Sequence, residues 1–118
     1  MAESIVVKAK IKEVATDSNV AGDFADALNE ALLAEVAKAE TRAKENGRKT
    51  AQTKDVFVGD LVTEPMLVVK SKAKAAVSDV NTSGDFADAL NTVAIQLVRQ
   101  AAAKASANSR KTVQAKDL

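Results

Sequence analysis

The stretch GDFADALN occurs twice in the chain, at residues 22–29 and again at residues 84–91. The same offset of 62 residues aligns residues 5–56 with residues 67–118 without a gap, and roughly half of the aligned positions are identical. A repeat of this length predicts that one supersecondary unit is present twice. It therefore decides the fold before any single helix is considered.

The segment between the two copies holds the only proline of the chain, Pro65, together with the acidic residues Asp60 and Glu64. Proline and polar residues are typical of connections between structural units. We therefore expect a first repeat over residues 1–62, a linker over residues 63–66 and a second repeat over residues 67–118.

Each repeat has the same predicted order of helices. A short amphipathic helix is expected over residues 5–17 and 67–79, followed by a loop rich in Asp, Asn, Ser and Gly. A long helix is expected over residues 23–45 and 85–107. The pairs Asn46-Gly47 and Asn108-Ser109 are expected to end these helices, because Asn and Gly tolerate the left-handed conformation of a helix C-terminus. A short third helix follows, which we expect to continue to residue 62 in the first repeat. The fold class is therefore all-α.

Each long helix has one apolar stripe at helical spacing. In the first repeat the stripe is Phe24, Leu28, Ala31, Leu32, Val36, Ala39 and Ala43. In the second repeat it is Phe86, Leu90, Val93, Leu97, Val98, Ala101 and Ala105. A unit of about 50 residues with one long and two short helices has no closed core of its own. We therefore expect the two repeats to pack against each other as an intramolecular pseudodimer.

The composition excludes several classes of function. The 118 residues include no Cys and no His, which rules out disulfides and thiol catalysis and removes the commonest general base and metal ligand. We therefore expect a non-enzymatic protein with no catalytic residues, no metal site and no cofactor. No apolar run approaches the roughly 18 residues of a membrane span, and the N-terminus does not resemble a signal peptide. The expected location is the cytoplasm.

The pattern R-K-T-x-x-x-x-D follows both long helices, as residues 48–55 and residues 110–117. With the order short helix, long helix, short helix, this pattern resembles the histone-fold family of archaea and bacteria. The resemblance is greatest to the small bacterial members, whose third helix is shortened. Because the whole chain is covered by two copies, it resembles a fused histone doublet, in which two tandem histone folds form a handshake pseudodimer.

The resemblance implies roles for the residues of the second loop in each repeat. Two ion pairs are expected to hold this loop to the third helix: Arg48 with Asp55, and Arg110 with Asp117. The residues expected to contact DNA phosphates from the loop are Lys49, Thr50, Lys111 and Thr112. In a handshake pair the first loop of one repeat lies beside the second loop of the other. The first loops here contain no Lys or Arg, which disfavours the insertion of a basic side chain into the minor groove.

Lysines also recur on the predicted first helices. Lys8 and Lys12, like Lys70 and Lys74, lie one helical turn apart on one face. Such a face can simply be solvated, or it can bind phosphate together with the nearby helix N-terminus. The resemblance favours phosphate contact, so these four lysines complete the expected DNA-binding set.

The expected function is therefore that of a nucleoid-associated, histone-like architectural protein. It would bind double-stranded DNA through phosphates, without sequence specificity, as a monomeric pseudodimer. The net charge of +1 is low for such a role. Residues 1–64 contain nine basic and twelve acidic residues, whereas residues 65–118 contain eight and four. This asymmetry supports an alternative, in which the chain is a histone-fold module that binds a protein partner and does not contact DNA directly.

Overall fold

The structure is a computed structural model that describes residues 6–15, 19–56, 61–62, 66–77, 80–114 and 117. Its elements are α1 (Lys8–Val14), β1 (Asn19–Val20), α2 (Phe24–Glu45), β2 (Thr50–Ala51), α3 (Thr53–Val56), α4 (Lys70–Ala76), β3 (Asn81–Thr82), α5 (Phe86–Ala107) and β4 (Thr112–Val113). We refer to α1 through α3 as the N-terminal half and to α4 through β4 as the C-terminal half.

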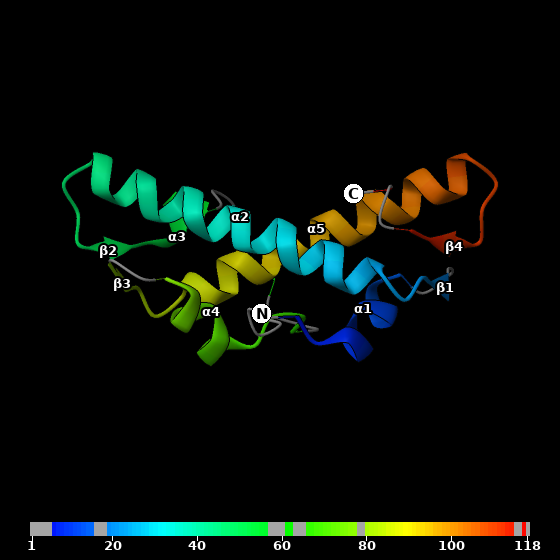
Figure 1. The fold of residues 1–118 in the computed structure, drawn as a ribbon, viewed down its shortest axis with the longest axis horizontal. Coiled ribbons are helices and arrows are strands. Elements are labelled where there is room, and N and C mark those ends of the chain that lie inside the picture. Colours follow the sequence, from blue (N-terminus) through cyan, green and yellow to red (C-terminus); the bar gives the residue numbers. More distant parts are fainter. Residues whose placement is uncertain are drawn as a thin grey trace.

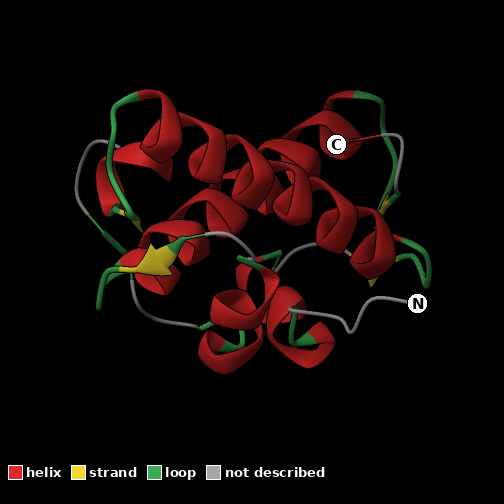
Figure 2. Cartoon of the chain, turned by 60° about the vertical axis from the view of Figure 1, so that its left-hand side comes forward, coloured by secondary structure: helices red, strands yellow, loops and turns green. Residues whose placement is uncertain are grey.

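The two long helices α2 and α5 cross near the middle of the molecule and contact each other (Figure 1). The short helices α1 and α4 lie together on one side of this crossing, below the long helices in Figure 2. Helix α3 packs against both α2 and α5, so the N-terminal half also contacts the long helix of the C-terminal half beyond the crossing. The molecule is elongated, and its principal extents are 47, 32 and 22 Å.

The predicted long helices are present, and each has 22 residues and begins one residue later than expected. The first helices are shorter than predicted, with seven residues each, and the prediction of residues 5–17 and 67–79 was wrong at their ends. Val6 and Val68 form an antiparallel bridge, and the Val7 amide donates to the Leu67 carbonyl over 2.7 Å. This pairing keeps the β-branched valines extended, so both helices begin only after them.

The third helix is also shorter than predicted. It covers four residues in the N-terminal half, Thr53–Val56, whereas residues 61–62 are not helical and residues 57–60 lie outside the described part. In the C-terminal half, the described part of the corresponding region is a 3₁₀ turn at Asp117. Of the expected linker, residues 63–65 lie outside the described residues as well.

The described residues also form four two-residue strands that the sequence did not predict, within a fold that is otherwise helical as expected. They form two parallel pairs, β1 with β4 and β2 with β3. Each pair joins the first loop of one half to the second loop of the other, which confirms the expected pairing of the loops. The two pairs lie at opposite ends of the long axis (Figure 1).

The long helices bury their predicted apolar stripes with a few exceptions. Phe24 and Phe86 are fully buried near the start of each helix. Ala31, Val93 and Leu97 are only half-buried, whereas the unpredicted Ala94 and Ile95 are buried. Helix α5 contacts α1, α2, α3, α4 and β4, so its buried face is wider than a single amphipathic stripe.

Asn91 is the last residue of the second GDFADALN stretch. Its side chain hydrogen-bonds to the backbone on both sides of the segment that connects the two halves. Its Oδ1 accepts hydrogen bonds from the amides of Leu67 and Val68, at 2.6 and 3.3 Å. Its Nδ2 donates to the Val62 carbonyl over 2.8 Å, and the Val62 amide donates to Thr92 Oγ1, also over 2.8 Å. The fully buried amide therefore satisfies backbone groups that would otherwise be buried without partners.

We expect Asn91→Ala to lower the free energy of unfolding by about 2–4 kcal/mol, because it leaves several buried backbone groups unsatisfied. Urea unfolding followed by circular dichroism measures the change. Gln100→Ala is the control, since Gln100 is an exposed amide residue on the same helix. Equal stability of the two variants would contradict the assignment.

Candidate nucleic-acid interface

The elements with the predicted DNA-binding residues lie on one side of the molecule. Helices α1 and α4 occupy the middle of this side, and the β1–β4 and β2–β3 pairs flank them at either end (Figure 1). The long helices lie above these elements in the same view. Residues far apart in the sequence are therefore arranged along one edge that follows the 47 Å axis.

The described lysines of the predicted set are all exposed, which a phosphate contact requires. They are Lys12, Lys49, Lys70, Lys74 and Lys111. Thr50 and Thr112 are half-buried. Lys8 is the first residue of α1, and its side chain lies outside the described part of the structure. One of the described lysines belongs to α1, two belong to α4 and one belongs to each second loop, which are the elements of this edge.

Lys70 is engaged within the protein. Its Nζ lies 3.5 Å from Asp88 Oδ1, a buried oxygen that accepts no hydrogen bond from the described residues. Lys70 therefore places a positive charge beside this buried carboxylate oxygen. Sequence spacing could not reveal this pairing, because Asp88 comes from the first turn of α5 while Lys70 begins α4.

The end of each long helix determines where the second loop begins. The Arg48 amide donates to the Ala43 carbonyl over 2.8 Å, and the Gly47 amide donates to the Lys44 carbonyl over 3.0 Å. This is a Schellman motif, in which the residue after the cap adopts a left-handed conformation. Gly47 has φ +68°, and Ser109 at the equivalent place has φ +58°. Both helices thus end at the predicted residues, but in the C-terminal half the left-handed residue is Ser109, in place of the Asn or Gly that the sequence predicted. Both ends direct an arginine into the loop.

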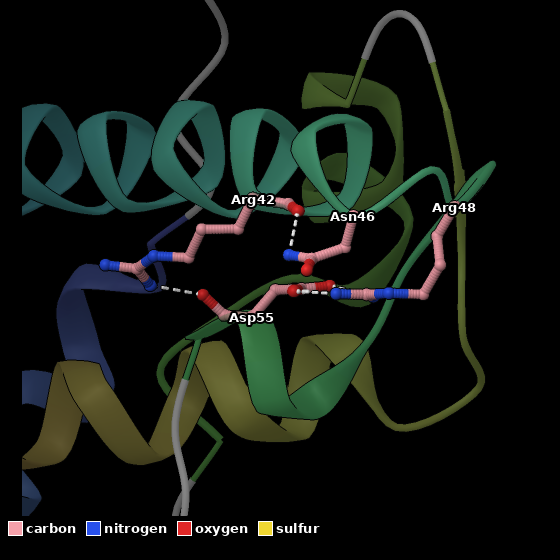
Figure 3. Close-up of a pocket in the computed structure, with 4 residues that line it drawn as sticks. All are labelled: Arg42, Asn46, Arg48 and Asp55. Carbon is pink, nitrogen blue, oxygen red and sulfur yellow. Dashed lines mark hydrogen bonds and ion pairs between the residues drawn. The ribbon is translucent and has the colours of Figure 1, made fainter.

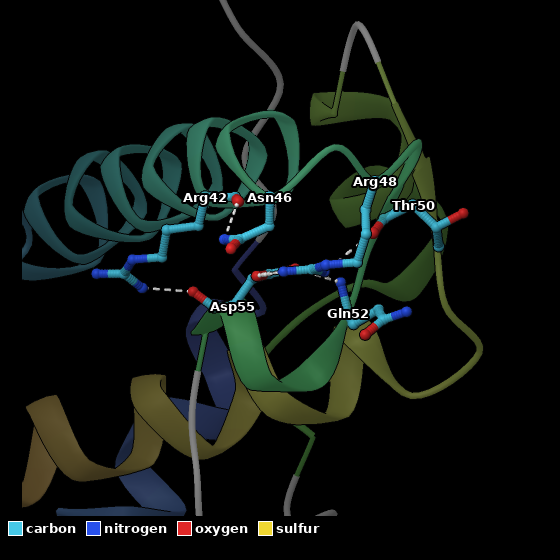
Figure 4. Close-up of polar contacts among 6 residues, drawn as sticks. All are labelled: Arg42, Asn46, Arg48, Thr50, Gln52 and Asp55. Carbon is cyan, nitrogen blue, oxygen red and sulfur yellow. Dashed lines mark hydrogen bonds and ion pairs between the residues drawn. The ribbon is translucent and has the colours of Figure 1, made fainter.

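Arg48 binds Asp55 through both of its terminal nitrogens, each 2.6 Å from a carboxylate oxygen (Figure 4). The Gln52 amide donates to Asp55 Oδ2 over 2.8 Å, so the same carboxylate also caps the start of α3. The aspartate is almost fully buried, and the bidentate geometry is that of a strong charge-assisted pair. The loop and the third helix are therefore held together at one point.

The C-terminal half has the same arrangement. Arg110 Nη1 and Nη2 lie 2.8 and 2.6 Å from the oxygens of Asp117, and the Gln114 amide donates to Asp117 Oδ2 over 2.8 Å. Hydrogen bonding to the aspartate raises the pKa of Arg110 above its ordinary value, and the same cause raises the pKa of Arg48. Both guanidinium groups therefore keep their charge throughout the pH range of a binding experiment.

A shallow pocket beside the first ion pair is lined by Arg42, Asn46, Arg48 and Asp55 (Figure 3). Arg42 donates to the backbone carbonyl of Asp55, and Asn46 Nδ2 donates to the Arg42 carbonyl over 2.8 Å. The side chains of this pocket bind one another and the backbone, which indicates a structural cluster. The C-terminal half repeats the ion pair and the Asn108 Nδ2 donation to the carbonyl of residue 104, over 2.8 Å, but it has Lys104 at the position of Arg42. The contact of the Arg42 side chain therefore belongs to the N-terminal half.

Other kinds of site find no support within the described ranges. No group of three or more acidic residues there is arranged to hold a metal ion. No described helix combines the length and the hydropathy that a membrane-spanning segment requires. The exposed lysines on the elements of this edge are therefore the candidate site considered below.

The fold is shared with a histone of known structure. The crystal structure of the histone from Methanopyrus kandleri matches the chain with a TM-score of 0.62 and 18% sequence identity. The match covers 95% of this chain and 89% of that one. No family model matches the sequence, and no curated protein does. The chain therefore has a mostly helical, histone-type fold.

The two helix ends provide a test of how the second loops are positioned. A Cβ added at Gly47 would meet no atom within 4 Å, so only the backbone conformation disfavours a side chain there. We expect Gly47→Ser to lower the free energy of unfolding by about 1 kcal/mol, and Ser109→Gly to raise it by a similar amount. Urea unfolding measures both. Shifts of the same sign in the two variants would contradict this account of the loops.

Proposed function

We propose that the protein is a histone-like architectural protein that binds double-stranded DNA through its phosphates, without reading the base sequence. The observation that carries this proposal is that the elements with the exposed lysines, which are α1, α4 and both second loops, lie along one side of a histone-type fold. Lysines and threonines suit phosphate oxygens, and contacts to phosphate carry no direct sequence information. Such a protein would be associated with the nucleoid.

We further propose that the chain is a histone doublet, with repeats at residues 1–62 and 67–118 joined by residues 63–66. Both parallel strand pairs join one half to the other, and the two long helices contact each other. The match to the Methanopyrus kandleri histone covers both halves of this chain on one chain of that protein. These observations favour a handshake pseudodimer within a single polypeptide.

The proposed contacts fall into three groups along the edge. Lys49 and Thr50 bind at one end, and Lys111 and Thr112 bind at the other. The lysines of the first helices bind in the middle, and these are Lys8, Lys12, Lys70 and Lys74. An edge of at most 47 Å corresponds to about 14 base pairs of straight duplex. One turn of the double helix is about 34 Å, so a single molecule can cover at most about one and a half turns.

The low net charge is compatible with this proposal because charges act locally at close range. The proposed contact set contains six lysines, whereas several acidic residues lie on the long helices. Asp88 is an acidic neighbour of one of these lysines, because its Oδ1 lies 3.5 Å from Lys70 Nζ. Asp55 and Asp117 are occupied by arginines, so they do not compete for the lysines of the loops.

Salt dependence is the direct test of phosphate binding. Six neutralised phosphates predict that the logarithm of the affinity falls with the logarithm of the salt concentration with a slope of about −5. Fluorescence anisotropy with unrelated duplexes at several salt concentrations measures the slope and the sequence preference.

We expect Lys49→Glu/Lys111→Glu to abolish most of the binding, because it reverses the charge at both ends of the edge. Lys38→Glu/Lys104→Glu makes the same change in net charge at exposed positions outside the proposed set.

Two outcomes would contradict DNA binding. One is a flat salt dependence, and the other is no binding of the wild type at about 50 mM salt. The alternative would then be a histone-fold module that docks a protein, for which the charge asymmetry between the halves is the supporting feature. Partners that remain bound in a lysate pull-down after nuclease treatment would favour that alternative.

The doublet proposal also predicts the state in solution. Because each half supplies the partner surface of the other, we expect a monomer with the mass of one chain, 12.3 kDa. Light scattering at micromolar protein concentration measures the mass. A dimer or tetramer under these conditions would contradict the intramolecular pairing.

A further inference from the structure

One lysine of the proposed contact set, Lys70, forms an ion pair across two helices. It begins α4, and its Nζ lies 3.5 Å from Asp88 Oδ1 in the first turn of α5. Helices α4 and α5 contact each other, so the pair joins two elements of the same half. A single ammonium group is thus shared between a carboxylate of the protein and the proposed phosphate.

The carboxylate of this pair is far less accessible than the lysine. The Asp88 side chain is 19% exposed, whereas the Lys70 side chain is 58% exposed. Asp88 Oδ1 is buried and accepts no hydrogen bond from the described residues. A ligand can therefore approach the ammonium group from solvent, while water has little access to the carboxylate oxygen beside it.

Separating Lys70 from this oxygen is unfavourable. A buried carboxylate oxygen without a hydrogen bond or an opposite charge has lost its solvation, and nothing in the protein replaces it. The first turn of a helix also favours an acidic side chain, which stabilises the carboxylate in this place. Lys70 can thus turn fully towards a phosphate only if Asp88 loses its counter-charge.

We propose that Asp88 restrains Lys70 and thereby limits the affinity of the edge for DNA. This inference rests on the proposed function, because it assumes that Lys70 binds a phosphate. The carboxylate holds the ammonium group against the protein, so only part of its charge is available to the ligand. Asp88 then regulates the interface through Lys70, without contacting DNA itself.

The restraint differs from simple repulsion between Asp88 and DNA. Repulsion would act whether or not residue 70 is a lysine, because it depends on the charge of the carboxylate alone. The restraint acts through Lys70 and disappears without it. A double-mutant cycle over the two residues therefore separates the two effects.

Asp88→Asn keeps the shape of the side chain and removes its charge, so it releases Lys70 to the phosphate. We expect the affinity for duplex DNA in the anisotropy assay to rise about two- to tenfold, as for other coupled neighbours. We also expect the salt slope to become steeper by up to about 0.9, because one more phosphate is fully neutralised.

Glu35→Gln is the matched control, since Glu35 Oε1 lies 3.6 Å from Lys38 Nζ and Lys38 is outside the proposed set. This variant makes the same change in net charge and also releases a lysine, but one that is not expected to meet DNA. We expect its affinity to stay within about twofold of the wild type. An equal rise in Asp88→Asn and Glu35→Gln would overturn the restraint.

Lys70→Ala completes the cycle. In this background we expect Asp88→Asn to change the affinity by no more than about twofold, because no lysine remains to be released. A rise as large as in the wild-type background would indicate direct repulsion and overturn the inference. A loss of affinity in Asp88→Asn alone would overturn it as well.

Asp88→Ser repeats the measurement with a smaller polar side chain of a type that is common near helix N-termini. Circular dichroism checks that each variant is folded. Wild-type affinity in both Asp88 variants would overturn the restraint and leave DNA binding intact. Failure of the wild type to bind would instead overturn the proposed function on which this inference rests.

Discussion

The rest of the structure depends on the mutual burial of the two long helices. Phe24 and Phe86 are both fully buried, and α2 and α5 contact each other where they cross. Each half is too small to enclose a core of its own, and each long helix is covered in part by elements of the other half. The way the helices cross then determines where the loops at the helix ends lie, and with them the short strands β1 to β4.

One consequence is that the first loop of each half lies beside the second loop of the other half. The end of each long helix turns through a left-handed residue, and the arginine that follows binds an aspartate seven residues later. This rigid turn directs the second loop onto the first loop of the opposite half. Each end of the molecule is therefore built from segments of both halves.

Sequence reasoning was accurate where local chemistry decides the outcome. The long helices, their C-terminal turns and the arginine–aspartate spacing all follow from residues close together in the chain. It was inaccurate where distant segments meet. The bridge between Val6 and Val68 delays the start of both first helices, and Asp88 forms an ion pair with Lys70. Asn91 hydrogen-bonds to the segment that connects the two halves. The spacing of these residues in the sequence does not predict the contacts, because each contact joins residues from different elements.

By itself, the sequence determined that the chain is a doubled helical unit without cysteine or histidine, whose basic loops follow long amphipathic helices. These properties depend on composition, periodicity and the chemistry of neighbouring residues, all of which are local. Only the tertiary structure decided which lysines are exposed, which are already paired, and which residues of one half lie beside those of the other. Such pairings depend on how two helices cross, and that geometry comes from packing between segments that no short stretch of sequence specifies.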